Sequence, residues 1–148
     1  MTNRKVTKCL SIKLLLVISL FFVATATKAQ NKIQVTSFNR METDVTARIT
    51  APQRDQNGEV CALIRIVTTI KDLMFEPDAL GIAARENKTG EIWLYVPRGA
   101  RRISIMHDKF GVLRNYFYPD IIDKGTVYEM EIRVNDGSGQ VAGDTSTQ

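Results

Sequence analysis

Residues 60–69 read VCALIRIVTT, and this run decides the fold class. It is apolar at consecutive positions, rich in β-branched residues, and preceded by the turn signal Asn57-Gly58. Consecutive apolar residues over this length predict a central strand that is buried on both faces of a sheet. Arg65 is the one charge inside the run, and because lone buried charges are rare we expect it to meet a carboxylate or an edge position.

The flanking sequence continues the strand pattern. In the clearest run, Tyr128–Val134, apolar side chains alternate with Glu129, Glu131 and Arg133. The other expected strands are Lys32–Phe38, Val45–Thr50, Leu73–Phe75, Leu80–Glu86, Glu91–Val96, Arg101–His107 and Val112–Tyr118. Seven to nine strands, spaced about 8–12 residues apart, predict an all-β fold built as an antiparallel β-sandwich.

The first 29 residues have the three parts of a secretory signal peptide. Basic residues up to Lys13 precede the apolar run Leu14–Ala24, and the small residues Thr27 and Ala29 follow it. The apolar run is shorter than the roughly 20 residues that a membrane-spanning helix needs. We therefore expect a signal peptide at residues 1–29, cleavage after Ala29 and an exported protein, and an uncleaved N-terminal anchor is the alternative.

Removal of the signal peptide changes the charge of the chain. The 148 residues carry a net charge of +4 and have a pI near 9.2. Residues 1–29 hold five of the 20 basic side chains and no acidic one, so the exported chain has 119 residues and a net charge of about −1. This argues against a nucleic-acid partner, because phosphate binding requires a concentrated basic surface. We expect no integral membrane segment after cleavage, a folded domain at 30–135, and a disordered tail or linker stub at 136–148.

Residues 90–111, GEIWLYVPRGARRISIMHDKFG, resemble the PEGA-type module of secreted and surface bacterial proteins. The shared features are an aromatic-apolar strand, a Pro/Gly turn at Pro97–Ala100, an alternating strand, and a closing turn of an aromatic residue and Gly. The closing pair, Phe110-Gly111, is reversed here, and the four-letter motif that names the family is absent. More broadly, residues 33–134 resemble an N-terminal module of exported proteins of Gram-negative gut bacteria.

The resemblance implies a β-sandwich of the transthyretin or carboxypeptidase-regulatory kind and supplies no catalytic residue. In such architectures the module is a spacer or an interaction platform. The implied location is the periplasm or cell surface of a Gram-negative bacterium, and the implied partner is an envelope protein or a glycan. We therefore expect a non-enzymatic interaction, assembly or spacer domain.

The residue types also argue against an enzyme. His107 is the only histidine, and Asp108, its neighbour along a predicted strand, points to the opposite face and is badly placed to orient the ring. Cys61 is the only thiol left after cleavage, and its apolar surroundings predict a buried, inert side chain that forms no intramolecular disulfide. One histidine and one buried thiol make no usual zinc site, so we expect no metal and no cofactor.

Aromatic and basic residues make the best candidate binding surface. Trp93 and Tyr95 share one face of a predicted strand, and Tyr116 and Tyr118 share one face of another. The candidate binding residues are these four aromatics and four arginines near them in sequence, Arg98, Arg101, Arg102 and Arg114. Exposed, such residues suit a protein or glycan partner; alternatively, the aromatics fill a core and the arginines form a solvated rim. The alternative function is a carbohydrate-binding module, which requires Trp93 and Tyr95 to lie coplanar and exposed.

Overall fold

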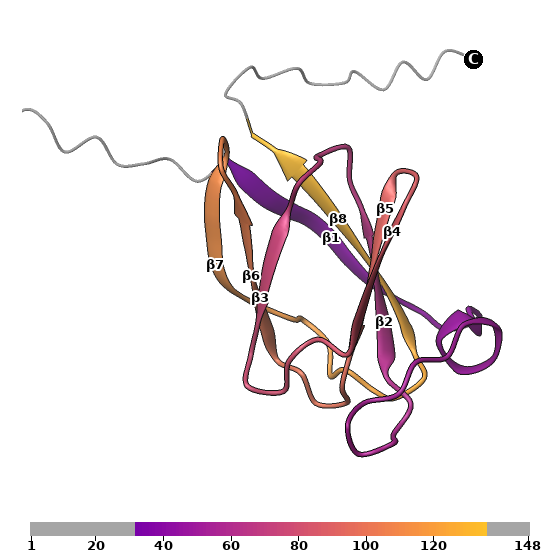
Figure 1. Ribbon diagram of the computed structural model, residues 1–148. Coiled ribbons are helices and arrows are strands. Elements are labelled where there is room, and N and C mark those ends of the chain that lie inside the picture. Colours follow the sequence, from indigo (N-terminus) through magenta and orange to yellow (C-terminus); the bar gives the residue numbers. More distant parts are fainter. Residues whose placement is uncertain (1–31, 136–148) are drawn as a thin grey trace, which may run out of the picture.

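The computed structural model describes residues 32–135, which form two facing β-sheets (Figure 1). The five-stranded sheet has the order β1-β8-β2-β5-β4, and the three-stranded sheet has the order β3-β6-β7. The elements are β1 (Ile33–Met41), η1 (Thr46–Thr50), β2 (Ala62–Val67), β3 (Met74–Pro77), β4 (Ala84–Lys88), β5 (Glu91–Val96), β6 (Arg102–His107), β7 (Gly111–Phe117) and β8 (Val127–Val134). The prediction of an all-β, sandwich-like fold is confirmed, with eight strands.

The central place of β2 is also confirmed. β2 lies between β8 and β5, and Ala62, Leu63, Ile64 and Ile66 are all buried. One detail differs from the expected antiparallel sandwich, because β2 and β8 run parallel while the other strand pairs are antiparallel. The last strand, β8, lies between the first two, β1 and β2. The alternation of apolar and polar residues predicts which side chains of a strand face the core, but it does not predict which strands lie beside it.

The main core lies between the two sheets. The five-stranded sheet supplies side chains such as Ile64 and Met130, and the three-stranded sheet supplies Ile103 and Ile105. Burial of these aliphatic side chains is the largest favourable contribution to folding, at roughly 1.5–3 kcal/mol for each side chain that is fully buried. Cys61 is the one cysteine among residues 32–135 and forms no disulfide, so packing holds the two sheets together.

A bulge in β1 changes the face on which its second half presents side chains. The register with β8 shifts after Val35, which leaves Thr36 as the extra residue. Strict alternation would turn Phe38 away from the core, but the bulge turns it inward, where its ring lies 5.5 Å from Tyr118 and 5.4 Å from Tyr128. The alternation of apolar and polar residues in the sequence does not reveal a bulge, because the bulge adds one unpaired residue to a single strand.

The predicted strand Val45–Thr50 is wrong, because this segment forms the helical turn η1 instead. The Asp44 carboxylate accepts a hydrogen bond from the Thr46 backbone N–H at 2.9 Å, and such a local bond turns the chain away from an extended path. Ala47 of η1 is fully buried on the outer face of the five-stranded sheet, in one cluster with Leu63. The small methyl side chain of Ala47 allows η1 to lie close to the sheet.

The predicted strand Leu80–Glu86 is placed too early, because β4 begins at Ala84. The Asp78 carboxylate accepts a hydrogen bond from the Leu80 N–H at 3.0 Å, which forms a turn. Gly81 then has a φ of +78°, a left-handed conformation that ends any extended run.

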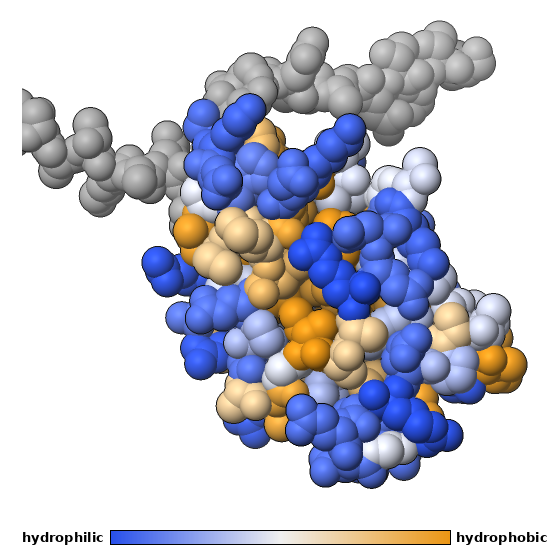
Figure 2. All heavy atoms as spheres, viewed as in Figure 1, coloured by the Kyte–Doolittle hydropathy of each residue, from blue (hydrophilic) through white to orange (hydrophobic). Residues whose placement is uncertain are grey.

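The side of the sandwich between β3 and β4 is incompletely closed. Figure 2 shows hydrophobic residues in the middle of this side and hydrophilic residues around them. Ile70, Phe75 and Ile82 are half-buried there against the main core. The Arg85 guanidinium lies 5.2 Å from the ring centroid of Phe75, so the edge strands β4 and β3 meet through a cation–π contact.

The described chain begins and ends at the same end of the sandwich, here called the terminal end (Figure 1). Ile33 pairs with Val134, and the Asn135 N–H donates to the Lys32 carbonyl at 2.7 Å. The opposite end is called the distal end. The predicted signal peptide at 1–29 and the predicted tail at 136–148 lie outside the described residues. Within 32–135, no helix has both the length and the apolar character needed to cross a membrane.

We predict that Tyr128→Phe destabilises the fold by about 2 kcal/mol. The Tyr128 hydroxyl donates to the Ile121 carbonyl at 2.7 Å and accepts from the Asp123 N–H at 3.0 Å, so the substitution removes both bonds. Urea unfolding followed by circular dichroism should show a lower midpoint with an unchanged slope. Tyr116→Phe is the control, because the Tyr116 hydroxyl makes no hydrogen bond within the described residues, and an equal loss in both variants would contradict the prediction.

Candidate functional site

The outer face of the five-stranded sheet is organised in rows that cross β1, β8, β2, β5 and β4. The first row is Met41, Val127, Leu63, Tyr95 and Ala84; the second is Asn39, Glu129, Arg65, Trp93 and Glu86; the third is Ser37, Glu131, Val67, Glu91 and Lys88. Residues paired in register point to the same side of a sheet. This face is therefore apolar toward the distal end and mostly charged toward the terminal end.

The chain itself covers the apolar row. Ala47 of η1, Cys61, Leu63 and Tyr95 form a second buried cluster on this face, separate from the main core. The Tyr95 hydroxyl donates to the Ala51 carbonyl at 2.9 Å, which ties the segment after η1 to the sheet. The two charged rows have no such cover among the described residues.

Trp93 lies at the border between the covered and the open rows and is half-buried. The Arg65 guanidinium lies 5.6 Å from the ring centroid of Trp93, and the Lys88 ammonium lies 4.8 Å from it. The indole N–H donates to the Glu91 carboxylate at 2.8 Å. Three neighbours therefore hold the ring in one orientation. We call Trp93, Arg65, Glu86, Lys88 and Glu91 the Trp93 face.

Arg65 meets a carboxylate, as predicted. Its guanidinium lies 2.8 Å from the Asp44 carboxylate and 3.6 Å from that of Glu91. Burial by itself would raise the pKa of Asp44, but hydrogen bonds from Thr46 and the nearby charge of Arg65 outweigh it and lower that pKa. The carboxylate stays ionised, and the ion pair fixes the loop before η1 to β2.

The structure separates the predicted aromatic residues into two groups. Trp93 and Tyr95 share the outer face of β5, as predicted, but Tyr95 is fully buried, so the exposed coplanar pair is wrong. Tyr116 and Tyr118 belong to the other sheet or its edge and pack toward the main core, with Tyr118 buried. The alternative that aromatics fill a core therefore describes Tyr95 and Tyr118.

The predicted arginines are exposed and lie on the side of the three-stranded sheet. Arg102 and Arg114 line a shallow cavity of about 160 Å³ with Glu76 and Ser104. Arg98 and Arg101 are exposed before β6, at the distal end. The four arginines are therefore remote from Trp93 in the fold, and they form no joint surface with it.

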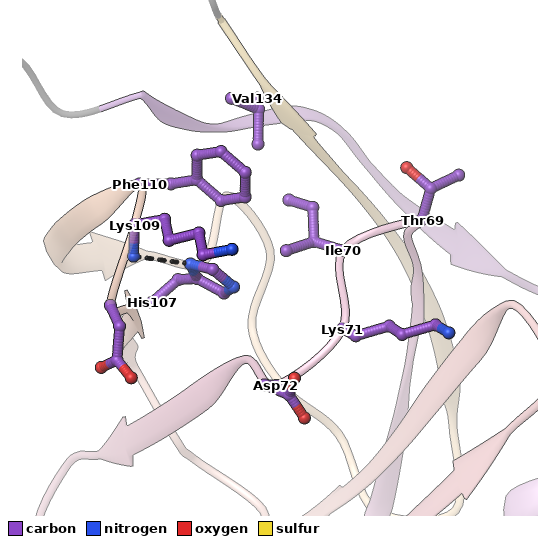
Figure 3. Close-up of a pocket in the computed structure, with 9 residues that line it drawn as sticks. Thr69, Ile70, Lys71, Asp72, His107, Lys109, Phe110 and Val134 are labelled. Atoms are coloured by element: carbon purple, nitrogen blue, oxygen red, sulfur yellow. Dashed lines mark hydrogen bonds between the residues drawn. The ribbon is translucent and has the colours of Figure 1, made fainter.

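His107 lines a cavity of about 550 Å³ at the terminal end (Figure 3). Ile70, Phe110 and Val134 point into this space from three different segments. The ring of His107 stacks on Phe110 at 4.5 Å, and its Nδ1 accepts a hydrogen bond from the Lys109 backbone N–H at 3.0 Å. The His107 ring is therefore oriented by a backbone N–H that donates to its Nδ1. In a catalytic triad the contact is different, because a carboxylate accepts a hydrogen bond from the Nδ1–H of the histidine.

Cys61 is fully buried within the second cluster. Burial, with a smaller effect of the Asp55 carboxylate, raises the pKa of its thiol, which keeps it protonated and poorly nucleophilic. Residues 32–135 contain no group of three or more His, Cys, Asp and Glu side chains arranged to hold a metal ion.

Comparison of the chain with family models, with curated proteins and with solved structures finds no match. The resemblance to the PEGA-type module stays a prediction, and the interpretation of the surface rests on its own geometry.

Sequence reasoning missed most of the surroundings of Trp93. Asp44, Lys88 and Glu91 were not identified, although Arg65 inside an apolar run indicated a nearby carboxylate. Glu91 precedes Trp93 by two positions on the same strand, so the sequence could have predicted that both side chains lie on one face of β5. The positions of Asp44 and Lys88 depend on the turn before η1 and on the pairing of β4 with β5.

We predict that Asp44→Asn lowers the free energy of unfolding by about 1–2 kcal/mol at pH 7, because it removes charged hydrogen bonds to Arg65 and Thr46. A carboxyl with a lowered folded-state pKa stabilises the fold above its unfolded pKa near 4 and loses this effect as the pH falls. The difference from wild type should therefore shrink as the pH falls below about 4 in urea unfolding.

Asp123→Asn is the matched control. It removes an exposed ion pair with Arg40 at 2.8 Å, for which we expect a loss below about 1 kcal/mol. An Asp44→Asn effect that stays constant between pH 7 and pH 3 would contradict the role assigned to the carboxylate.

Proposed function

We propose that this protein is an exported, non-enzymatic β-sandwich module that binds a protein partner in the bacterial envelope and supports an interaction or an assembly there. The observation that carries the proposal is the Trp93 face, where an aromatic ring is held in place by Arg65, Lys88 and Glu91 on an uncovered half of a sheet.

Rigid aromatic and arginine side chains favour such a role. Tryptophan and arginine are enriched among the residues that contribute most to protein–protein binding. A ring that is already held by its neighbours loses little conformational freedom when a partner binds. The alternating signs of Arg65, Glu86, Lys88 and Glu91 supply a charge pattern that selects a complementary surface.

Two features of the sequence support the proposed location. The predicted signal peptide at 1–29 supports export, and the resemblance to the PEGA-type module supports the periplasm or cell surface of a Gram-negative bacterium and a spacer or platform role. The described chain begins and ends at the terminal end, and no described segment covers the two charged rows, which supports a partner at the outer face of the five-stranded sheet.

A protein partner suits this face better than a glycan does. The carbohydrate-binding alternative relied on Trp93 and Tyr95 together, and the burial of Tyr95 leaves one ring on the face. A single half-buried ring flanked by ion pairs offers a glycan little flat surface on which to stack.

The sole tryptophan makes this surface directly observable. Protein labelled with 5-fluorotryptophan has one ¹⁹F position, at Trp93. We expect the soluble proteins of an envelope extract to shift or broaden this resonance, because a partner that covers the face changes the environment of the ring. Protease treatment of the extract should abolish the change.

Paired variants show whether the change arises at this face. Glu129→Lys reverses a charge beside Arg65 in the second row and should weaken the effect about tenfold, whereas Arg114→Gln on the other sheet should leave it intact. No change of the resonance with any protein fraction would refute a partner at this face. A change caused by envelope polysaccharide alone would favour the carbohydrate-binding alternative.

A further inference from the structure

Four segments meet at the distal end, of which only the last two are close together in sequence. The Gly99 N–H donates to the Ile122 carbonyl at 2.9 Å, and the Tyr118 N–H donates to the Arg101 carbonyl at 2.9 Å. The Asp78 carboxylate accepts from the Arg101 N–H at 2.7 Å. These bonds join residues 78–81, 97–102, 117–118 and 120–122 into one surface, which we call the distal surface.

The distal surface carries large apolar side chains that nothing in the described chain covers. Ile121 is 79% exposed, Phe117 is 65% exposed and Leu80 is 50% exposed. They come from three of the four segments. Soluble proteins expose such residues singly, whereas several at one end of a domain indicate a contact surface.

Arginines accompany these apolar residues. Arg98 and Arg101 are exposed on the segment between β5 and β6, and Arg102, the exposed first residue of β6, pairs across the strands with Phe117. None of the ion pairs within residues 32–135 uses these three arginines. The Arg102 guanidinium donates to the Asn115 side-chain amide, which is uncharged.

Glu76 lines the same cavity as Arg102, and the other acidic groups leave the charge of Arg98 and Arg101 largely unbalanced. Asp78 accepts hydrogen bonds from the backbone N–H groups of Leu80 and Arg101. Asp123 pairs with Arg40 on β1 at 2.8 Å. Asp120 remains, beside the exposed Lys124 on the same loop.

The distal surface lies at the opposite end of the sandwich from the terminal end. The Lys32 N–H bonds to the Phe110 carbonyl at the terminal end, and Phe117 lies at the other end of β7. A strand rises about 3.3 Å per residue, so roughly 20 Å separate the two ends. Figure 1 shows the loops of this surface at the opposite end of the sandwich from the start of β1 and the end of β8.

We propose that the distal surface docks on an anionic lipid membrane, with Ile121, Phe117 and Leu80 entering the interfacial layer and Arg98, Arg101 and Arg102 binding lipid phosphates. Apolar side chains on a few loops together with basic residues are the combination that binds a protein to the surface of an anionic bilayer. Guanidinium groups without carboxylate partners are free to bind phosphate in a bidentate manner. This surface is separate from the Trp93 face and does not depend on the function proposed for it.

Cosedimentation with vesicles tests the inference. The protein, purified after export, is mixed with vesicles of phosphatidylcholine alone or with 30% phosphatidylglycerol. We expect binding to the anionic vesicles that weakens as the salt concentration rises. Arg98→Gln with Arg101→Gln should lower the partition coefficient about tenfold or more, since each basic residue near an anionic surface adds severalfold. Ile121→Ser with Phe117→Ser should lower it by a similar factor.

Matched variants near the terminal end distinguish binding through the distal surface from nonspecific binding of the protein to vesicles. Met74→Ser removes an exposed apolar side chain from β3, and Arg133→Gln removes an exposed arginine from β8. Both should bind as wild type does, and all variants should keep the wild-type circular dichroism spectrum. Absence of vesicle binding, equal binding to uncharged vesicles, or equal losses in the distal and terminal variants would overturn the proposal. A protein partner of the distal surface would leave the vesicles unbound.

Discussion

β2 has buried apolar side chains on both faces, and each side of the five-stranded sheet therefore needs a cover over them. The three-stranded sheet covers the inner face and encloses the main core. The outer face receives η1, whose Ala47 packs with Leu63 and Tyr95. The turn into η1 is in turn held by Asp44, which pairs with Arg65 on β2 itself. The buried strand thus supplies both the apolar side chains that need a cover and the charge that anchors this cover.

The cover ends between the first and the second row, and this limit creates the candidate site. Trp93 packs against the second cluster on one side and meets charged residues on the other. The indole N–H donates a hydrogen bond to Glu91, and the ring makes a cation–π contact with Lys88 on β4. A surface formed in this way is rigid before a partner arrives, which lowers the entropic cost of binding.

The two proposed surfaces use different parts of one sandwich. The Trp93 face lies on the side of the five-stranded sheet, while the distal surface lies at the end away from the chain ends. A module docked on a membrane by its distal end would hold the Trp93 face beside the bilayer, at a height set by strand length. The distal surface is tied to the five-stranded sheet, since the Tyr128 hydroxyl joins the loop of Ile121 to β8.

The all-β class, the central buried strand, the limits of β5 and the faces of β8 followed from the sequence, because hydrophobic periodicity records which side chains leave water. The expectation for Arg65 followed too, since a charge within an apolar strand needs a partner. The helical turn at 46–50, the bulge at Thr36 and the parallel pairing of β2 with β8 did not follow. Tertiary structure alone decided that Tyr95 is covered, that Trp93 stays at a border and that Gly99 meets the loop of Ile121. The physical reason is that the faces of a strand depend on local alternation, whereas its neighbours and its cover depend on contacts between residues distant in sequence.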